Sequence, residues 1–263
     1  MLLLFAGSAS QNQKVVWKSV LDSWHYLSLI YNDQTSNGIR TILILPLLIL
    51  SMKIDINKYN PPFTLYGNGQ IPHHQIPLDK LKKSGTIISI DGGADKLKSL
   101  KLDSHIILGD LDSLKKAKAD YECLVFELKD QSKSDLEKSL DWCIQKKINT
   151  ISLIGFSGGR FDHELTSLLL LEYFSDKIQL NYYSDHCEIH CFKGLRTFDS
   201  FKGQVISIFS LNLKTIIRTS GLKYNLKNDQ LNSPSNGVSN VSMKDKFSID
   251  SSSSIFVIQN YKK

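Results

Sequence analysis

Residues 86–95 have the sequence TIISIDGGAD, in which a mostly apolar run of five residues ends in an aspartate and two glycines. Such a run predicts a buried parallel strand followed by a polar turn. Two later stretches repeat the pattern, HIILGDLDS at 105–113 and ISLIGFSGGRFDH at 151–163. Because open α/β sheets bind their ligands at the carboxyl ends of the strands, we expect the three turns to meet in one site.

The sequence around these stretches alternates between strand and helix over residues 62–175. Such alternation predicts an α/β domain with a mostly parallel sheet and right-handed crossovers. The expected strands are 63–66, 86–90, 106–108 and 151–154, and the expected helices are 78–83, 94–100, one that follows Ser134 and one that starts near Asp162.

From residue 176 onward the helical periodicity disappears, and alternating or β-branched runs take its place. Turn-rich segments separate these runs. Residues 176–263 are therefore predicted to form a second domain, an all-β sandwich. Its expected strands are 178–183, 187–192, 204–210, 215–218 and 254–259.

Residues 1–61 form an N-terminal extension in this division. The apolar stretches 1–6 and 41–50 are shorter than the roughly 20 residues that span a bilayer, and Pro46 interrupts the second. The first also lacks the basic region of a signal peptide. We expect no membrane anchor, and we expect residues 1–51 to be dispensable, with Met52 as a candidate true start.

The composition indicates an ordinary globular protein, with 41% hydrophobic and 22% charged residues. The formal net charge of +6 comes from scattered lysines without a basic run, so nucleic acid is not expected as a partner. Four cysteines do not make a disulfide framework in a chain of 263 residues. They favour a reducing, cytoplasmic location.

The segment HCEIHC at 186–191 has the residue types of a zinc site. On a strand, however, alternate side chains point to opposite faces, so the two histidines share one face and the two cysteines the other. Side chains on two opposite faces of a strand cannot all bind one tetrahedral zinc ion. A plain strand is the favoured interpretation.

Asp110 and Asp112 alternate with Leu111 in GDLDS, so on an extended strand end both carboxylates would project to one side. Such a pair suits Mg²⁺, which takes one or two carboxylates and leaves its other positions to water and phosphates. Asp91 ends the neighbouring strand, and the glycines after it, Gly92 and Gly93, let the backbone approach a ligand. A turn or a helix cap is the alternative for an isolated acidic pair.

The segment SDLEK predicts a helix start, with Ser134 as the N-cap and Glu137 as its partner in a capping box. Asp135 then lies in the first turn. Lys138 lies three residues further on the same face, so a carboxylate and an ammonium group would approach one ligand together. The alternative is an aspartate that stabilises the helix dipole and a solvated lysine.

The glycine-rich turn GFSGGR offers backbone N–H groups for an anion, and Arg160 is suited to grip phosphate oxygens with two hydrogen bonds. It matches neither a Walker A loop nor a dinucleotide fingerprint. The alternative is a tight turn with a surface arginine, after which Asp162 only caps the next helix.

The sequence DLDS after an apolar strand also resembles the nucleophile loop of haloacid dehalogenase-type phosphatases. There Asp110 would attack phosphate and Asp112 would act as acid and base. That pattern requires Thr or Val where this chain has Leu114, and it explains neither GGRFDH nor the β-rich end of the chain. We therefore rank it below the metal site.

Six motifs in this order resemble the thiamine pyrophosphokinase family over residues 62–263: DGGAD, GDLDS, SDLEK, GFSGGRFDH, TSGLKYNL at 219–226 and SNGVSN at 235–240. The resemblance implies an α/β nucleotide-binding domain and a β-sandwich, in a homodimer that holds thiamine at the subunit interface. It implies an ATP-dependent diphosphotransferase that makes thiamine diphosphate and AMP. A non-catalytic sensor of thiamine or nucleotide is the alternative from another functional class.

The resemblance also implies the roles of single residues. Mg²⁺ and the triphosphate would be served by Asp91, Asp110, Asp112 and Asp135. The phosphates of ATP would be surrounded by Gly92, Gly93, Ser113, Lys138, Gly158, Gly159, Arg160, Asp162 and His163. Thiamine would contact Tyr224, Ser239 and Asn240. The departures from the family pattern are Leu111 for Phe, Ser134 for Thr, Ser167 for Asn and Tyr224 for the more common Trp.

Overall fold

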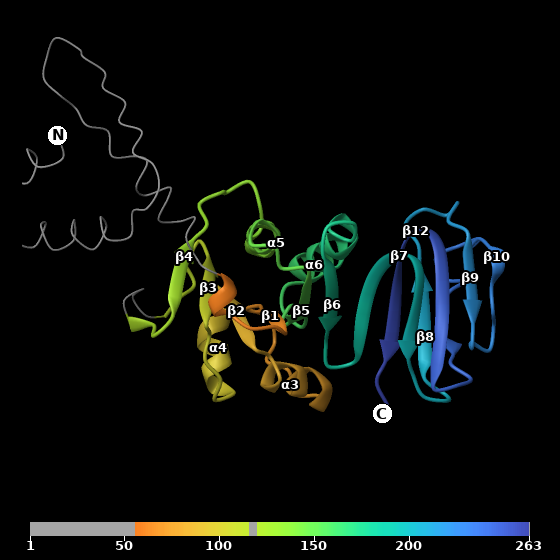
Figure 1. The fold of residues 1–263 in the computed structure, drawn as a ribbon, viewed down its shortest axis with the longest axis horizontal. Helices are drawn as coiled ribbons and strands as arrows, with labels where there is room; N and C mark the ends of the chain where they lie inside the picture. The colour runs from red at the N-terminus through yellow and green to blue at the C-terminus, as the bar shows by residue number, and fades with distance from the viewer. Residues whose placement is uncertain (1–55, 116–119, 263) are drawn as a thin grey trace, which may run out of the picture. The chain divides into compact units, whose positions relative to one another are not determined.

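The computed structural model describes residues 56–115 and 120–262, which belong to one compact unit, 54–263. Figure 1 labels its helices and strands. The expectations for residues 1–51, including a start at Met52, lie outside the described residues. No helix among the described residues is both long and apolar enough to cross a membrane.

Parallel strands form the first part of the structure. Their order in space is β6-β5-β1-β2-β3-β4, and each pairs in parallel with its neighbours. Leu65 lies opposite both Ile88 and Leu153, so the sheet centre is apolar. The strands are β1 (Phe63–Tyr66), β2 (Thr86–Ile90), β3 (Ile106–Gly109), β4 (Leu124–Glu127), β5 (Thr150–Ile154) and β6 (Gln179–Tyr183).

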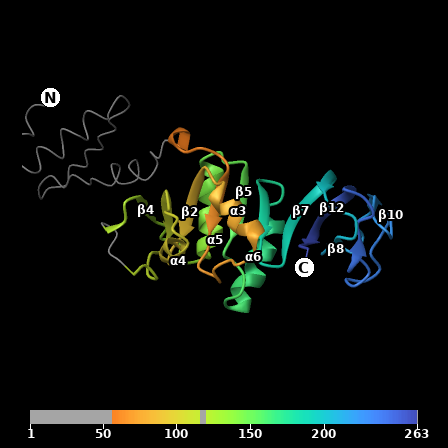
Figure 2. The same ribbon diagram turned by 90° about the horizontal axis from the view of Figure 1, so that it is seen from below.

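Helices cover both faces of this sheet (Figures 1 and 2). On one face α5 (Asp135–Gln145) and α6 (Phe161–Tyr173) pack on the largest apolar cluster through Leu140 and Leu171. On the other face α3 (Gln75–Lys82) and α4 (Gly93–Ser99) contribute Leu81 and Leu97 to a smaller cluster. A short 3₁₀ helix, η2 (Ile56–Lys58), precedes β1.

The strand order reverses direction between β1 and β5. From β1 the chain builds outward through β2 and β3 to β4, and then returns to place β5 on the other side of β1. Such a reversal opens the crevice in which doubly wound sheets bind ligands, at the carboxyl ends of the two strands. The loops that follow Tyr66 and Ile154 therefore border the expected site.

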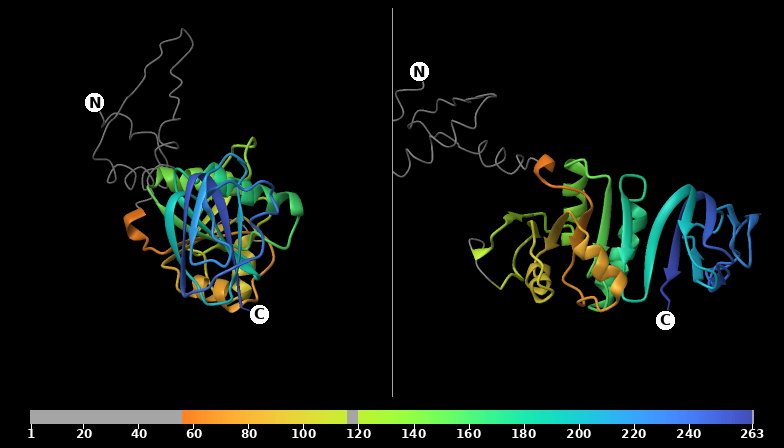
Figure 3. Two further views of the ribbon diagram at one scale, coloured as in Figure 1. Left: turned by 90° about the vertical axis from the view of Figure 1, so that its right-hand side faces the viewer. Right: turned by 60° about the horizontal axis from the view of Figure 1, so that its bottom comes forward.

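The second part is β-rich and continuous with the first (Figure 3). β6 pairs in an antiparallel manner with β7 (Cys187–Asp199), and β12 (Lys246–Asn260) pairs along the whole of β7. The two ends of β12 pair with β8 (Val205–Phe209) and β9 (Ile217–Ser220). The shorter strands β10 (Lys227–Asp229) and β11 (Asn240–Val241) pair with β9 and β8 respectively.

The long pair of β7 and β12 bends so that its two ends enclose one apolar core. Gly194 has a φ of +85°, and opposite it the register shifts between Ser251 and Ile255. Phe198 and Val257, from opposite ends of the pair, share a cluster with side chains of β8 and β9. β6 joins the two parts, because it pairs in parallel with β5 and in an antiparallel manner with β7.

Candidate active site

Three aspartates meet at the carboxyl ends of β2 and β3. One carboxylate oxygen each from Asp91, Asp110 and Asp112 lies within 4.8 Å of the others. These residues form the one such acidic group found in residues 56–115 and 120–262. The sequence predicted this meeting from two separate motifs.

The backbone that creates the cluster is a turn and not the extended strand end that the sequence suggested. Leu111 has a φ of 69° and Asp91 a φ of 47°, both in the left-handed region that is costly for residues with a Cβ. A Cβ at Gly109 would lie 3.1 Å from the Cβ of Asp91, so the two strand ends approach closely. The prediction that Asp110 and Asp112 share one side through an extended backbone is therefore wrong, although they do meet.

Asp91 is buried beside the two other carboxylates of the cluster. Burial raises the pKa of Asp91, hydrogen bonding from Ser113 lowers it, and the nearby carboxylates of Asp112 and Asp110 raise it further. Ser113 donates its N–H to Asp91 Oδ1 at 3.3 Å and its hydroxyl to Asp112 Oδ1 at 3.0 Å. Ser113 therefore orients two of the three carboxylates.

One oxygen of the cluster is left without a partner. Asp110 Oδ1 is buried and accepts no hydrogen bond from the described residues. A buried carboxylate oxygen that lacks a donor is costly unless a cation lies beside it. The three carboxylates together fit a divalent metal ion, because Mg²⁺ and Ca²⁺ prefer oxygen ligands.

Asp135 lies apart from this group, at the start of α5. The Oγ of Ser134 accepts a hydrogen bond from the N–H of Glu137 at 3.2 Å, as the predicted N-cap requires. Asp135 Oδ1 is 2.7 Å from Lys138 Nζ, and this buried ammonium also donates to the carbonyl of Leu128 at 3.1 Å. The pair on one helical face that the sequence predicted is present, as an ion pair.

The glycine-rich turn after β5 already has carboxylate partners. The N–H of Gly158 donates to Glu164 Oε2 at 3.1 Å, and the exposed guanidinium of Arg160 is paired with Asp162. This pairing lowers the pKa of Asp162. His163 donates its own N–H to the same carboxylate at 3.1 Å. The turn therefore holds anions, and in this structure they come from the first turn of α6.

Sequence reasoning gave no role in the site to the loop 67–70, which follows β1. Its Gly67 and Gly69 donate their N–H groups to the carbonyls of Ile154 and Gly155, at 2.8 and 2.6 Å. On its other side a Cβ added to Gly93 would lie 2.8 Å from the carbonyl oxygen of Gly67. The glycines of three motifs are thus packed backbone to backbone. The sequence signal was GNG directly after a predicted strand.

The residues predicted for thiamine lie in the β-rich part. Tyr224 is 64% exposed, and Lys223 Nζ lies 5.3 Å from the centre of its ring. The buried side chain of Asn240 accepts from the N–H of Tyr224 at 3.1 Å and donates to its carbonyl at 2.7 Å. Ser239 donates its N–H to Ser207 Oγ at 3.1 Å. The structure brings Tyr224 and Asn240 together.

These residues do not lie near the acidic cluster within one chain. Tyr224 belongs to the connection between β9 and β10, and the aspartates follow β2 and β3. Figure 1 shows β3 and the β9–β10 pair at opposite ends of the described residues. Within one chain, the residues predicted for the metal and those predicted for thiamine therefore lie apart.

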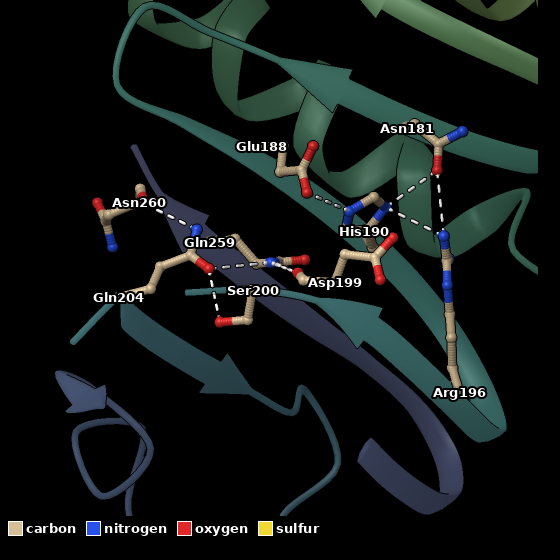
Figure 4. Close-up of polar contacts among 9 residues, drawn as sticks. All are labelled: Asn181, Glu188, His190, Arg196, Asp199, Ser200, Gln204, Gln259 and Asn260. Atoms are coloured by element: carbon tan, nitrogen blue, oxygen red, sulfur yellow. Dashed lines mark hydrogen bonds and ion pairs between the residues drawn. The ribbon is translucent and has the colours of Figure 1, made fainter. Parts of the chain in front are cut away.

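From Cys187 onward the segment considered for zinc is a strand, as predicted, and His186 lies in the bend before it. On one face of β7, Glu188 Oε1 lies 3.4 Å from Nε2 of the buried His190, and Asn181 Oδ1 lies 3.0 Å from its Nδ1 (Figure 4). Cys191 and Cys187 pack instead in the apolar cluster beneath α5 and α6. The ring nitrogens of His190 are therefore engaged by neighbouring side chains.

Comparison with known proteins assigns the two parts of the chain to one family. The family model described as thiamin pyrophosphokinase, catalytic domain, matches residues 78–182, and the one described as thiamin pyrophosphokinase, substrate-binding domain, matches residues 190–258. Together they cover more than half of the chain. Thiamin pyrophosphokinase 1 of Caenorhabditis elegans is 36% identical over 98 residues, which are 34% of this chain and 40% of that protein. The match thus spans less than half of that relative's length.

Solved structures share the fold. Thiamine pyrophosphokinase from Bacillus subtilis superposes with a TM-score of 0.65 and 20% identity, covering 76% of this chain and 99% of that one. The enzyme from Candida albicans gives 0.65 and 20%, covering 76% and 88%. The yeast protein gives 0.61 and 19%, covering 89% and 98%. At these identities the likeness is one of fold.

Proposed function

Because the chain belongs to the thiamin pyrophosphokinase family, we propose that it transfers the pyrophosphoryl group of ATP to the hydroxyl of thiamine. The products are thiamine diphosphate and AMP. The observation that carries the proposal is the meeting of Asp91, Asp110 and Asp112 within 4.8 Å at the edge of the sheet where such folds bind ligands. Because three carboxylates and a triphosphate are all negatively charged, a divalent cation is needed to hold them together.

Mg²⁺ is the cation proposed for this site. Asp91, Asp110 and Asp112 would hold it, and the unpartnered oxygen of Asp110 supports this assignment. Bound there, the ion would offset negative charge on the phosphates. Asp135 is proposed to act from the start of α5, where its pairing with Lys138 supports a role toward the phosphates and not a place in the metal cluster itself.

The phosphates of ATP are proposed to lie across the reversal of strand order. Gly92 and Gly93 offer backbone without side chains on one side of it, and Gly158 and Gly159 do so on the other. Arg160 is exposed and held by Asp162, a surface ion pair that contributes little to stability and therefore costs little to exchange for phosphate. The further proposed phosphate contacts are Ser113, Lys138 and His163.

Thiamine is proposed to bind between two copies of the chain, with Tyr224 packed on its rings and the Ser239–Asn240 pair nearby. An exposed aromatic face suits the thiazolium cation. The separation of β3 from the β9–β10 pair in Figure 1 supports a homodimer, because a second copy is needed to bring Tyr224 to the acidic cluster.

The chemistry is a substitution at the β-phosphorus of ATP. The hydroxyl oxygen of thiamine bonds to that phosphorus, the bond from the phosphorus to the bridging oxygen of the α-phosphate breaks, and AMP leaves with that oxygen. The hydroxyl proton passes to water. The residues of this chain bind and align the two substrates, and Arg160 and Lys138 offset charge that develops on the phosphate oxygens.

The test is to incubate the purified protein with ATP, Mg²⁺ and thiamine and to follow nucleotides and thiamine phosphates by chromatography. Equal amounts of AMP and thiamine diphosphate, both abolished by EDTA, are expected. ADP with thiamine monophosphate would contradict pyrophosphoryl transfer. Thiamine binding without turnover would identify a sensor, and phosphate release from monoesters without ATP would identify the phosphatase chemistry at Asp110.

A further inference from the structure

Lys96 makes a contact that no motif assigns. It lies in α4, and its ammonium Nζ donates to the carbonyl oxygens of Asn68 at 2.6 Å and Gly69 at 2.7 Å. Both distances are at the short end for charge-assisted hydrogen bonds, which are about twice as strong as neutral ones. A lysine near the end of a helix ordinarily faces the carbonyls of its own last turn. Lys96 instead holds the loop that follows β1.

That loop connects the two halves of the candidate site. On one side the Asn68 side chain packs against Gly92, where an added Cβ would lie 2.6 Å from Asn68 Nδ2. On the other side the N–H groups of Gly69 and Gln70 donate to the carbonyls of Gly155 and Ser157, at 2.6 and 2.8 Å. The loop therefore bridges the DGGAD segment, which contains Asp91, and the glycine-rich turn.

The bridge has little stiffness of its own. Gly67 and Gly69 lie one residue apart in it, and glycine loses more conformational freedom on ordering than any other residue. Within the described ranges, no backbone N–H donates to the carbonyl of Asn68 or Gly69. The ammonium of Lys96 is thus the group that fixes both carbonyls.

We propose that Lys96 is a positioning residue for ATP, acting through the loop 67–70 in the reaction proposed above. By holding two successive carbonyls it keeps the DGGAD segment and the glycine-rich turn at a fixed spacing. An ATP molecule that spans both segments needs that spacing before it binds. Lys96 is not a member of the acidic cluster, and its hydrogen-bond partners are the two loop carbonyls.

The test compares Lys96→Met with Lys96→Arg and with the control Lys98→Met, an exposed lysine on the same helix whose ammonium lies over the ring of Tyr121. Removing the ammonium is expected to raise the KM for ATP about tenfold, with the KM for thiamine within twofold of the unaltered protein. Arginine, whose fork can donate to two carbonyls, is expected to restore most of the ATP affinity. Lys98→Met should match the unaltered protein.

A second measurement does not depend on turnover. Hydrogen exchange of the peptide that contains Gly69 and Gln70 reports how firmly the loop is held against β5. Exchange there should become faster in Lys96→Met, normal in Lys96→Arg and normal in Lys98→Met. If the unaltered protein transferred no pyrophosphoryl group, the proposed function would fail, and this exchange together with calorimetry of ATP binding would still decide the role of Lys96.

The proposal is overturned by an unchanged KM for ATP in Lys96→Met, or by unchanged exchange in the loop. It is equally overturned if the KM for thiamine rises together with the KM for ATP in Lys96→Met, because that pattern indicates a general loss of structure. Failure of arginine to restore ATP affinity would also contradict it, since the contact requires only two donors from one cation.

Discussion

The side-chain amide of Asn240 is hydrogen-bonded to both backbone polar groups of Tyr224, accepting from its N–H at 3.1 Å and donating to its carbonyl at 2.7 Å. The same amide oxygen also accepts from the N–H of Val241 at 2.8 Å. The amide thus takes the place of a neighbouring strand beside Tyr224. Although the sequence predicted Asn240 as a direct contact for thiamine, its polar atoms are largely occupied in holding the tyrosine.

Asn240→Ala is therefore expected to weaken thiamine binding through Tyr224. The N–H and carbonyl of Tyr224 would lose their partner, and the loop would no longer hold the ring in one position. We expect the KM for thiamine to rise about tenfold while the KM for ATP stays within twofold, as measured by steady-state kinetics. Asn236→Ala, at an exposed position in the same turn-rich segment, should change neither constant.

Asp112→Asn tests the acidic cluster. Loss of one carboxylate should lower kcat/KM by roughly a thousandfold, because a metal site contributes several kcal/mol to stabilising the transition state. Without metal the variant should melt no lower than the unaltered protein, since one of three crowded negative charges is gone. Differential scanning fluorimetry with and without Mg²⁺ gives this second result. Asp103→Asn, exposed before β3, is the matched control, and full activity of Asp112→Asn would refute the metal assignment.

Asp91 predicts a pH dependence of stability in the absence of metal. Its pKa is raised in the folded chain, so the native state holds this proton more tightly than the unfolded chain does. The resulting penalty is absent below the unfolded pKa of about 3.9 and grows as the pH rises through the folded pKa. Asp91→Asn should therefore raise the free energy of unfolding more at pH 7 than at pH 4.

Urea denaturation in EDTA at the two pH values measures this difference. An equal gain at pH 4 and pH 7 would show that the carboxylate charge carries no penalty in the native state.

Arg160→Lys probes the proposed grip on phosphate. Lysine keeps the charge but cannot donate two parallel hydrogen bonds, so the KM for ATP is expected to rise about tenfold. Because Arg160 is exposed and its ion pair with Asp162 lies at the surface, the melting temperature should stay within about 1 °C. Arg218→Lys, on the exposed side of β9, is the control. If both variants have the same KM for ATP, Arg160 does not bind the phosphates.

Much of the parallel part could be predicted from the chain because each local signal agreed with the fold. The strand at 86–90 has the predicted bounds, and Ser134 caps its helix as its hydroxyl and Glu137 indicated. β4 was missed although Leu124, Val125 and Phe126 form a short apolar run, and its four residues are at most half-buried at the sheet edge. β6 was placed with the β-rich end because its composition resembles the strands after it, and in the structure it pairs both with β5, in parallel, and with β7, in an antiparallel manner.

The site could be predicted as a set of residues but not as a geometry. Asp91, Asp110 and Asp112 were recognisable because each follows an apolar strand. The left-handed turn at Leu111 was not, because leucine gives no local signal for a positive φ and the conformation is imposed by the close approach of the strand ends. Lys96 was missed for a similar reason, since its partners lie 27 and 28 residues away in sequence.

β12, the last strand that the structure describes, lies inside the β-rich part and not at its edge. β12 pairs with β7 along one side and with β8 and β9 along the other. The strands β7, β8 and β9 therefore lack a hydrogen-bonding partner until residues 246–260 have been synthesised. During synthesis the parallel sheet is complete once Tyr183 has left the ribosome, whereas the β-rich part lacks one of its strands until residues 246–260 have followed. A chain that stops before residue 246 would expose unpaired strand edges, and such edges can pair with other chains and cause aggregation.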